Sequence, residues 1–107
     1  QKAANQAMTI VGDGLQTRDF THVRDVVQAN ILSALSDNEK IHGEIFNVGT
    51  GKNHSILDIA KRIGGEYAHI PAREGESRET LASIDKISEM LGYEPSVKLE
   101  DWIDQNK

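Results

Sequence analysis

Residues 9–35 constrain the fold most, because their pattern changes from strand-like to helix-like within one short stretch. Residues 9–11 are β-branched or apolar, and the glycines of residues 12–14 predict a tight turn. Residues 19–23 alternate polar and apolar side chains, as a half-buried strand does. A helix is predicted from about Arg24 to Leu35, because apolar residues recur with helical spacing at Val23, Val27, Ile31 and Leu35.

The rest of the sequence continues to alternate strand and helix signals. Residues 44–48 are typical of a buried strand, and residues 66–70 of another, closed by Pro71. Between them, residues 56–63 have an amphipathic helical pattern, opened by the capping-box-like pair Ser55 and Asp58. This alternation predicts an α/β fold.

Two further helices are predicted near the C-terminus, and part of one at the N-terminus. Ser83 is a candidate N-cap for a helix over residues 84–91. Residues 99–105 form a last short helix, with Trp102 and Ile103 expected to face inward. Residues 1–8 favour a helix and lack an N-cap, so they are either the end of a helix that begins upstream or a frayed terminus.

Length and charge narrow the class of protein. The 107 residues, 37% of them hydrophobic, form at most one small domain with a modest core, so we treat 1–107 as a single domain. A net charge of −5 argues against a nucleic-acid surface. There are no cysteines, and the four histidines are scattered without metal-ligand spacing. No apolar run is long enough for a membrane span and no leader is visible, so we expect a cytoplasmic protein.

Three blocks carry a family resemblance. The first runs from Gly12 through the Thr17-Arg18-Asp19-Phe20 sequence to Asp25, the second is Phe46-Asn47-Val48-Gly49-Thr50-Gly51, and the third joins Pro71-x-Arg73-x-Gly75-Glu76 to the Leu91–Pro95 sequence. In order and spacing they resemble the C-terminal, substrate-binding part of the extended short-chain dehydrogenases. These are the NAD-dependent nucleotide-sugar epimerases and dehydratases, such as the UDP-glucose 4-epimerases. The resemblance implies a small α/β lobe of short strands and about four helices, without the Rossmann half.

The resemblance also turns ordinary polar residues into candidate ligand contacts. Taken alone, Arg18 and Arg73 are surface charges, although a planar guanidinium suits phosphate. The resemblance implies that both bind the diphosphate of a nucleotide sugar, most simply a UDP-sugar, and that Glu76 accepts hydrogen bonds from a ribose hydroxyl. It also implies a ligand contact for Asn47, whose alternative role is to orient a neighbouring loop. Arg78 is a weaker candidate, and Thr80 replaces a tyrosine of one relative.

The chemistry of such enzymes has no counterpart in these residues. The glycines at residues 49–51 lack the G-x-G-x-x-G spacing of a dinucleotide site, so a plain strand-to-helix turn is the better interpretation. Neither Tyr67 nor Tyr93 has a lysine four positions later, so no Tyr-x-x-x-Lys pair exists. We therefore expect no catalytic residue, metal or cofactor in this chain, and NAD in a separate N-terminal half.

Three roles stay open at this point. The chain could be the nucleotide-sugar-binding part of an epimerase or dehydratase, a free-standing module that binds a nucleotide sugar without chemistry, or an interaction domain that has lost the ligand. Because a lobe of this kind exposes apolar surface, we expect a homodimer or association with a chain that supplies the NAD-binding half.

Overall fold

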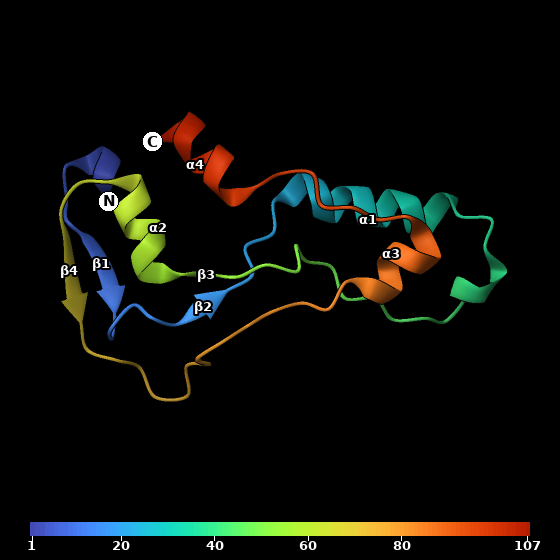
Figure 1. Ribbon diagram of the computed structural model, residues 1–107, viewed down its shortest axis with the longest axis horizontal. Helices are drawn as coiled ribbons and strands as arrows, with labels where there is room; N and C mark the ends of the chain where they lie inside the picture. The colour runs from blue at the N-terminus through green and yellow to red at the C-terminus, as the bar shows by residue number, and fades with distance from the viewer.

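The computed structural model describes residues 1–107 as a thin, elongated molecule of 50 × 32 × 18 Å. Figure 1 shows two groups of elements joined by extended segments: β1, β4, α2 and α4 at one end, and α1 with α3 at the other. With four α-helices and short strands, the structure confirms the predicted α/β class. None of the helices combines the length and the apolar character that a membrane crossing requires.

The first end is built on a parallel strand pair. β1 (Met8–Val11) lies beside β4 (Tyr67–Ile70), with Met8 opposite Tyr67 and Val11 opposite Ile70. α2 (Ile56–Ile63) packs on β1 and on α4 (Leu99–Asn106). The hydroxyl of Ser55 accepts a hydrogen bond from the Asp58 amide at 3.0 Å, so the predicted N-cap is confirmed.

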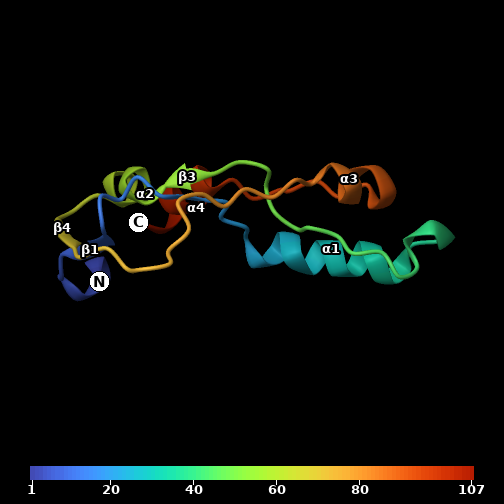
Figure 2. The ribbon, with the colours of Figure 1, turned by 90° about the horizontal axis from the view of Figure 1, so that it is seen from below.

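The second end is held by a small apolar cluster. α1 (Val23–Leu35) packs on α3 (Asp85–Leu91) through Ala29, Ile87 and Tyr93. Figure 2 shows the molecule edge-on, with these two helices facing each other. The Tyr93 hydroxyl is buried and donates a hydrogen bond to the carbonyl oxygen of Gly49 at 2.8 Å. This bond attaches the cluster to the centre of the molecule.

A buried carboxylate fastens α1 to the chain before α4. Asp25 is only 1% exposed and accepts hydrogen bonds from the Ser96 amide at 2.9 Å, the Ser96 hydroxyl at 2.7 Å and the Val97 amide at 3.2 Å. Burial alone would raise the pKa of Asp25, but the three donors outweigh it and hold this pKa below its ordinary value. From sequence, the position of Asp25 in the first turn indicates only a favourable interaction with the helix dipole. The structure shows instead that Asp25 is hydrogen-bonded to Ser96, 71 residues further along the chain.

Two of the predicted strands are wrong. The strand predicted at residues 19–23 does not form. The strand in this region is β2 (Thr17–Arg18), which comes just before those residues and pairs antiparallel with β3 (His54–Ser55). Residues 19–22 leave the ladder because the side chain of Asp19 bonds two other segments, at residues 50–51 and at Ala82, and because His22 accepts the Arg24 amide as the N-cap of α1. Residues 44–48 form no strand, because no other segment of this chain pairs with them.

Smaller differences occur at the helix ends. Residues 1–8 are not the end of an α-helix: a 3₁₀ turn at Lys2–Ala4 stops at Asn5, whose φ of 54° is left-handed, and β1 follows. A second 3₁₀ turn spans Glu39–Ile41. Ile84 rather than Ser83 precedes α3, without a side-chain cap. Ile103 is buried as expected, but Trp102 is 44% exposed, because α4 has only one side covered in this thin molecule.

We predict that Asp25→Asn lowers the free energy of unfolding by about 1–3 kcal/mol, because the amide cannot accept all three hydrogen bonds and presents donors to donors. Urea unfolding followed by circular dichroism measures the change. Stability should also fall as the pH drops below the ordinary carboxyl pKa, since the folded chain binds this proton less readily than the unfolded chain.

Asp37→Asn is the matched control, because Asp37 is exposed in a loop and makes no hydrogen bond. It should leave both the unfolding midpoint and its pH dependence nearly unchanged. Equal effects from the two substitutions would show that the Asp25 crosslink does not stabilise the fold.

Candidate functional site

Arg18 is held against the loop that precedes the C-terminal helices. At the end of β2, its guanidinium donates to the carbonyl oxygen of Thr17 at 2.8 Å and to that of Ser77 at 2.6 Å. Glu76 Oε1 lies 3.5 Å from Nη2 of Arg18, and the Arg18 side chain is 22% exposed. The guanidinium is therefore fixed in direction by contacts within the chain.

Arg73 and Glu76 border one small cavity. It has a volume of about 200 Å³ and lies between the β1–β2 turn and residues 72–78; it is lined by Val11, Gly12, Asp13, Gln16, Ala72, Arg73, Glu76, Ser77 and Arg78. Arg73 is exposed and makes no hydrogen bond or ion pair within the chain. The structure thus brings Arg73 and Glu76 to one cavity, and Arg18 reaches its edge through Glu76.

A paired arginine closes the other side of this cavity. Arg78 donates to both carboxylate oxygens of Asp13, at 2.8 and 2.9 Å. The hydrogen bond from Arg78, helped by the Leu15 amide, lowers the pKa of Asp13 to about 2. Because Asp13 already neutralises its charge, Arg78 is the least available of the three arginines for an anion. The pair instead connects the 71–78 loop to the glycine turn.

Asn47 lies in a different hollow. That hollow has a volume of about 450 Å³ and is also lined by Asp19, Thr21, Phe46, Val48, Thr80, Leu81 and Ala82. The Asn47 side chain makes no hydrogen bond within the chain, so it does not orient a loop here. The structure therefore separates Asn47 from the arginine cavity and places it beside Thr80.

Asp19 has a structural role that sequence patterns did not indicate. Its carboxylate accepts hydrogen bonds from the Thr50 amide and hydroxyl at 3.0 and 2.6 Å, from the Gly51 amide at 3.0 Å and from the Ala82 amide at 3.3 Å. Burial opposes ionisation, but these donors hold the pKa of Asp19 below its ordinary value. The motif around the adjacent Arg18 predicts a phosphate ligand, whereas no local sequence pattern shows which backbone amides Asp19 would bind.

The same contacts argue against a dinucleotide site in this chain. In a dinucleotide fold, free amides of a glycine turn meet the pyrophosphate at a helix N-terminus. Here the amides of Thr50 and Gly51 already bind Asp19, and α2 begins only at Ile56. Residues 49–51 therefore do not fit the pyrophosphate of NAD.

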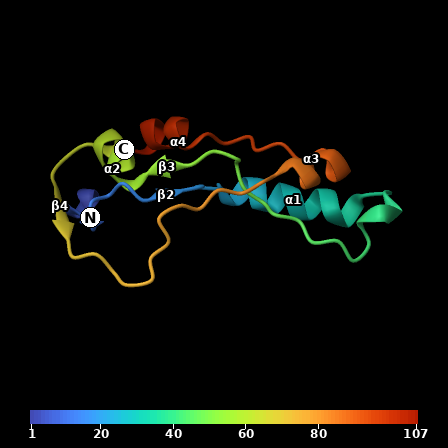
Figure 3. The ribbon, with the colours of Figure 1, turned by 60° about the horizontal axis from the view of Figure 1, so that its bottom comes forward.

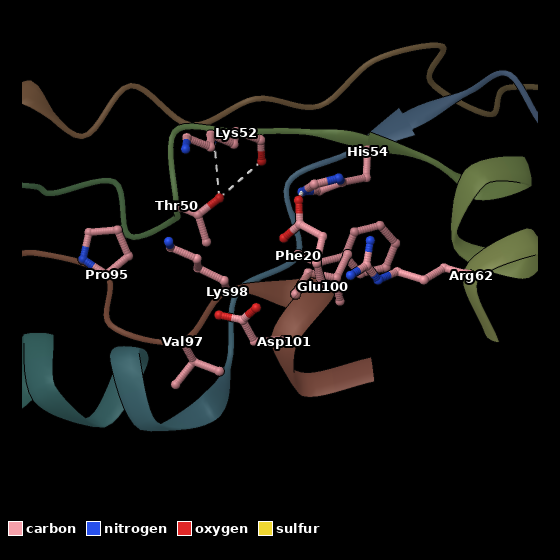
Figure 4. Close-up of a pocket in the computed structure, with 11 residues that line it drawn as sticks. Phe20, Thr50, Lys52, His54, Arg62, Pro95, Val97, Lys98, Glu100 and Asp101 are labelled. Atoms are coloured by element: carbon pink, nitrogen blue, oxygen red, sulfur yellow. Dashed lines mark hydrogen bonds and ion pairs between the residues drawn. The ribbon is translucent and has the colours of Figure 1, made fainter. Parts of the chain in front are cut away.

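A further cavity of about 420 Å³ lies between α2, β3 and the start of α4, as Figure 4 shows. Its basic and acidic side chains are mixed; they are Lys52, His54, Arg62, Lys98, Glu100 and Asp101. His54 Nε2 lies 3.7 Å from Glu100 Oε1, and Arg62 binds Asp104 with two hydrogen bonds. None of the four residues predicted from sequence lines this cavity.

Comparison with known proteins identifies the family. A family model described as GDP-mannose 4,6 dehydratase matches residues 1–106. The chain is 42% identical, over 92% of its length, to a Methanocaldococcus jannaschii protein whose assignment as a UDP-glucose 4-epimerase is provisional. It is 32% identical, over 88% of its length, to the UDP-glucuronate 4-epimerase of Thermodesulfobacterium geofontis.

Solved structures agree with the sequence relatives. A UDP-glucuronic acid 4-epimerase from Bacillus cereus, in complex with UDP-glucuronic acid and NAD, matches 97% of the chain with 34% identity and a TM-score of 0.86. The UDP-glucose 4-epimerase of Thermotoga maritima, with UDP-glucose, matches 94% with 33% identity and a TM-score of 0.80.

The match covers only part of each relative. The chain spans 32% of the Methanocaldococcus protein, 30% of the Thermodesulfobacterium enzyme and 35% of the Bacillus cereus structure, about a third in each case. The matched part is the C-terminal part of these proteins. The chain therefore belongs to the extended short-chain dehydrogenase family of NAD-dependent nucleotide-sugar epimerases and dehydratases, and corresponds to the C-terminal part of its members.

Proposed function

We propose that this chain binds the diphosphate of a nucleotide sugar, with a UDP-hexose as the preferred class, and serves as the substrate-binding part of an epimerase or dehydratase. One observation carries the proposal. Arg73 has no acidic partner and lines a cavity at whose edge the Arg18 guanidinium is already fixed. Two guanidinium groups at one cavity suit a diphosphate, because each can make charge-assisted hydrogen bonds to phosphate oxygens.

The size of the cavity supports a partial site. Pockets for small ligands usually enclose about 300–1,000 Å³. The cavity at Arg73 holds about 200 Å³, enough for a diphosphate but not for a whole nucleotide sugar. The base and the sugar must then contact other residues, including some outside this chain.

Glu76 and Asn47 complete the proposed contacts. Glu76 borders the cavity and accepts only one long hydrogen bond, from Arg18, so an oxygen is available for a ribose hydroxyl. Asn47 has a free amide in the neighbouring hollow, so it would meet a different part of the ligand from the arginines.

In the proposed enzyme, the reacting groups would come from outside this chain. NAD, when bound in such an enzyme, supplies hydride transfer to and from the sugar. This chain has no Tyr-x-x-x-Lys pair, and the amides of its glycine-containing turn at residues 49–51 already donate hydrogen bonds to Asp19. Its own residues would bind and orient the nucleotide sugar. The same observations also fit a free-standing binding module without chemistry, and turnover in the presence of an NAD-binding half separates the two roles.

We predict that UDP-glucose binds this chain weakly and saturably. Amide chemical shifts in NMR titrations should change at residues 12–18 and 71–78. Arg73→Gln and Arg18→Gln should each weaken binding by about tenfold to a hundredfold, because each removes a charge-assisted contact of about 1.5–3 kcal/mol.

The matched control is Arg24→Gln, which removes the same charge from an exposed position on α1. It should leave binding unchanged. If Arg24→Gln weakens binding as much as Arg73→Gln, the attraction is nonspecific and the proposed site is wrong.

A second prediction concerns chemistry. The 107-residue chain, incubated with UDP-glucose and NAD, should give no UDP-galactose and no absorbance at 340 nm from reduced cofactor. Epimerisation measured by chromatography of the nucleotide sugars would contradict the view that the reacting groups lie outside this chain.

A further inference from the structure

The cavity between α2, β3 and the start of α4 is separate from the proposed nucleotide-sugar site. Its volume of about 420 Å³ lies in the range of about 300–1,000 Å³ that pockets for small ligands usually enclose. It shares no lining residue with the arginine cavity or with the hollow at Asn47. Figures 1 and 3 both show α2 and α4 on one side of β2 and β3, and residues 71–78 on the other side. A ligand of this cavity would therefore be a different one.

Two lysines bring free positive charge to this cavity from distant parts of the sequence. Lys52 follows the turn at residues 49–51, and Lys98 directly precedes α4. Both side chains line the cavity, and neither makes an ion pair within the chain. Figure 4 shows both ammonium groups on the side of the cavity that Thr50 and Pro95 form. A carboxylate at this place can accept a charge-assisted hydrogen bond from each lysine.

Two carboxylates give the same cavity a negative side. Asp101, in the first turn of α4, makes no ion pair within the chain. Glu100 Oε1 lies 3.7 Å from His54 Nε2. A hydrogen bond from its own backbone amide, together with nearby positive charges, holds the pKa of Glu100 below its ordinary value, so Glu100 is ionised at neutral pH. In Figure 4 both carboxylates lie on the side of α4.

An apolar wall forms the third part of the cavity. It consists of four half-buried residues: Phe20, Pro95, Val97 and Leu99. A ligand that covers them removes apolar surface from water, which favours binding. The remaining cation of the lining, Arg62, already donates two hydrogen bonds to Asp104. The free charges of the cavity are therefore those of the lysines on one side and of the carboxylates on the other.

We infer that this cavity binds a small zwitterion, an α-amino acid with an apolar side chain. The ligand carboxylate contacts Lys52 and Lys98, the ligand ammonium group contacts Glu100 and Asp101, and the side chain covers the apolar wall. An anion alone would meet two carboxylates, and a cation alone would meet two ammonium groups. Only a ligand with both charges is complementary to the whole cavity. This inference does not depend on the proposed function, because the two sites share no residue.

NMR titration of the 107-residue chain with L-leucine is the first test. Because the charged groups are largely exposed and water screens them, we expect a Kd on the order of 1 mM. Amide chemical shifts should change saturably at residues 50–54 and 97–101. The nucleotide-sugar site is reported by residues 12–18 and 71–78 instead, so the two proposals can fail separately. L-Valine and L-phenylalanine are titrated in the same way, and no saturable change with any of the three would overturn the inference.

Two analogues of leucine that each lack one charge test the zwitterion. 4-Methylpentanoate keeps the carboxylate and lacks the ammonium group, whereas isopentylamine keeps the ammonium group and lacks the carboxylate. Each should bind at least about threefold more weakly than leucine. If 4-methylpentanoate binds as tightly as leucine, the cavity is a simple anion site. If isopentylamine does so, it is a simple cation site, and either result overturns the inference.

Charge variants connect binding to the named side chains. Lys98→Gln should weaken leucine binding by about threefold to tenfold and should not weaken that of isopentylamine. Asp101→Asn should weaken leucine binding by a similar factor and should not weaken that of 4-methylpentanoate. Both residues are exposed and have no ion-pair partner, so the fold should be unchanged.

The matched controls are Lys40→Gln and Asp37→Asn. They remove the same charges from exposed positions at the end of the molecule that holds α1 and α3. Leucine should bind both variants as it binds the unchanged chain. Equal weakening by the controls and by the cavity variants would show that only the overall charge matters, and this would overturn the inference.

Discussion

The structure depends on buried and half-buried carboxylates that join segments far apart in the sequence. Asp19 receives hydrogen bonds from residues 31 and 63 positions further along, and Asp25 from residues 71 and 72 positions further along. A charged acceptor makes stronger hydrogen bonds than a neutral one and is costly to bury without them. In a chain with so few buried apolar residues, these bonds decide which loops meet.

The geometry of the candidate site follows from those bonds. Asp19 lies directly after Arg18, so its contacts with Thr50 and Ala82 fix the strand end that carries the guanidinium. The Asp13–Arg78 pair holds the 71–78 loop over the glycine turn. Gly49 packs tightly against Asp19 and Ala82: a Cβ at this position would lie 2.4 Å from the Cβ of Ala82 and 2.7 Å from a carboxylate oxygen of Asp19. The backbone that carries Arg18 is thus held by Asp19, which is not among the proposed ligand contacts.

The weak core and the exposed apolar surface have the same origin. Apolar residues are present, but many of them lie on the exposed side of α1 or at Ile45, where no other part of this chain covers them. The parallel pair β1–β4 and the antiparallel pair β2–β3 are two-stranded and small. Neither strand pair therefore forms a sheet large enough to bury a substantial apolar layer.

The sequence alone predicted α2, α1, β1 and β4 almost to the residue, because periodicity, the Ser55 cap and glycine or proline stops are local signals. Three motif blocks also predicted the family. The residues of those blocks suggested Arg18, Arg73, Glu76 and Asn47 as ligand contacts, yet only the tertiary structure placed Asn47 in a separate hollow and left Arg73 unpaired.

The failures were non-local. Residues 44–48 have strand composition, but a strand exists only when another strand pairs with it, and none in this chain does. Residues 19–22 alternate like a strand, but Asp19 and His22 use their side chains to bond elsewhere. Periodicity therefore determined which segments could be helix or strand. Tertiary contacts decided which of them formed, because hydrogen-bond partners lie dozens of residues away.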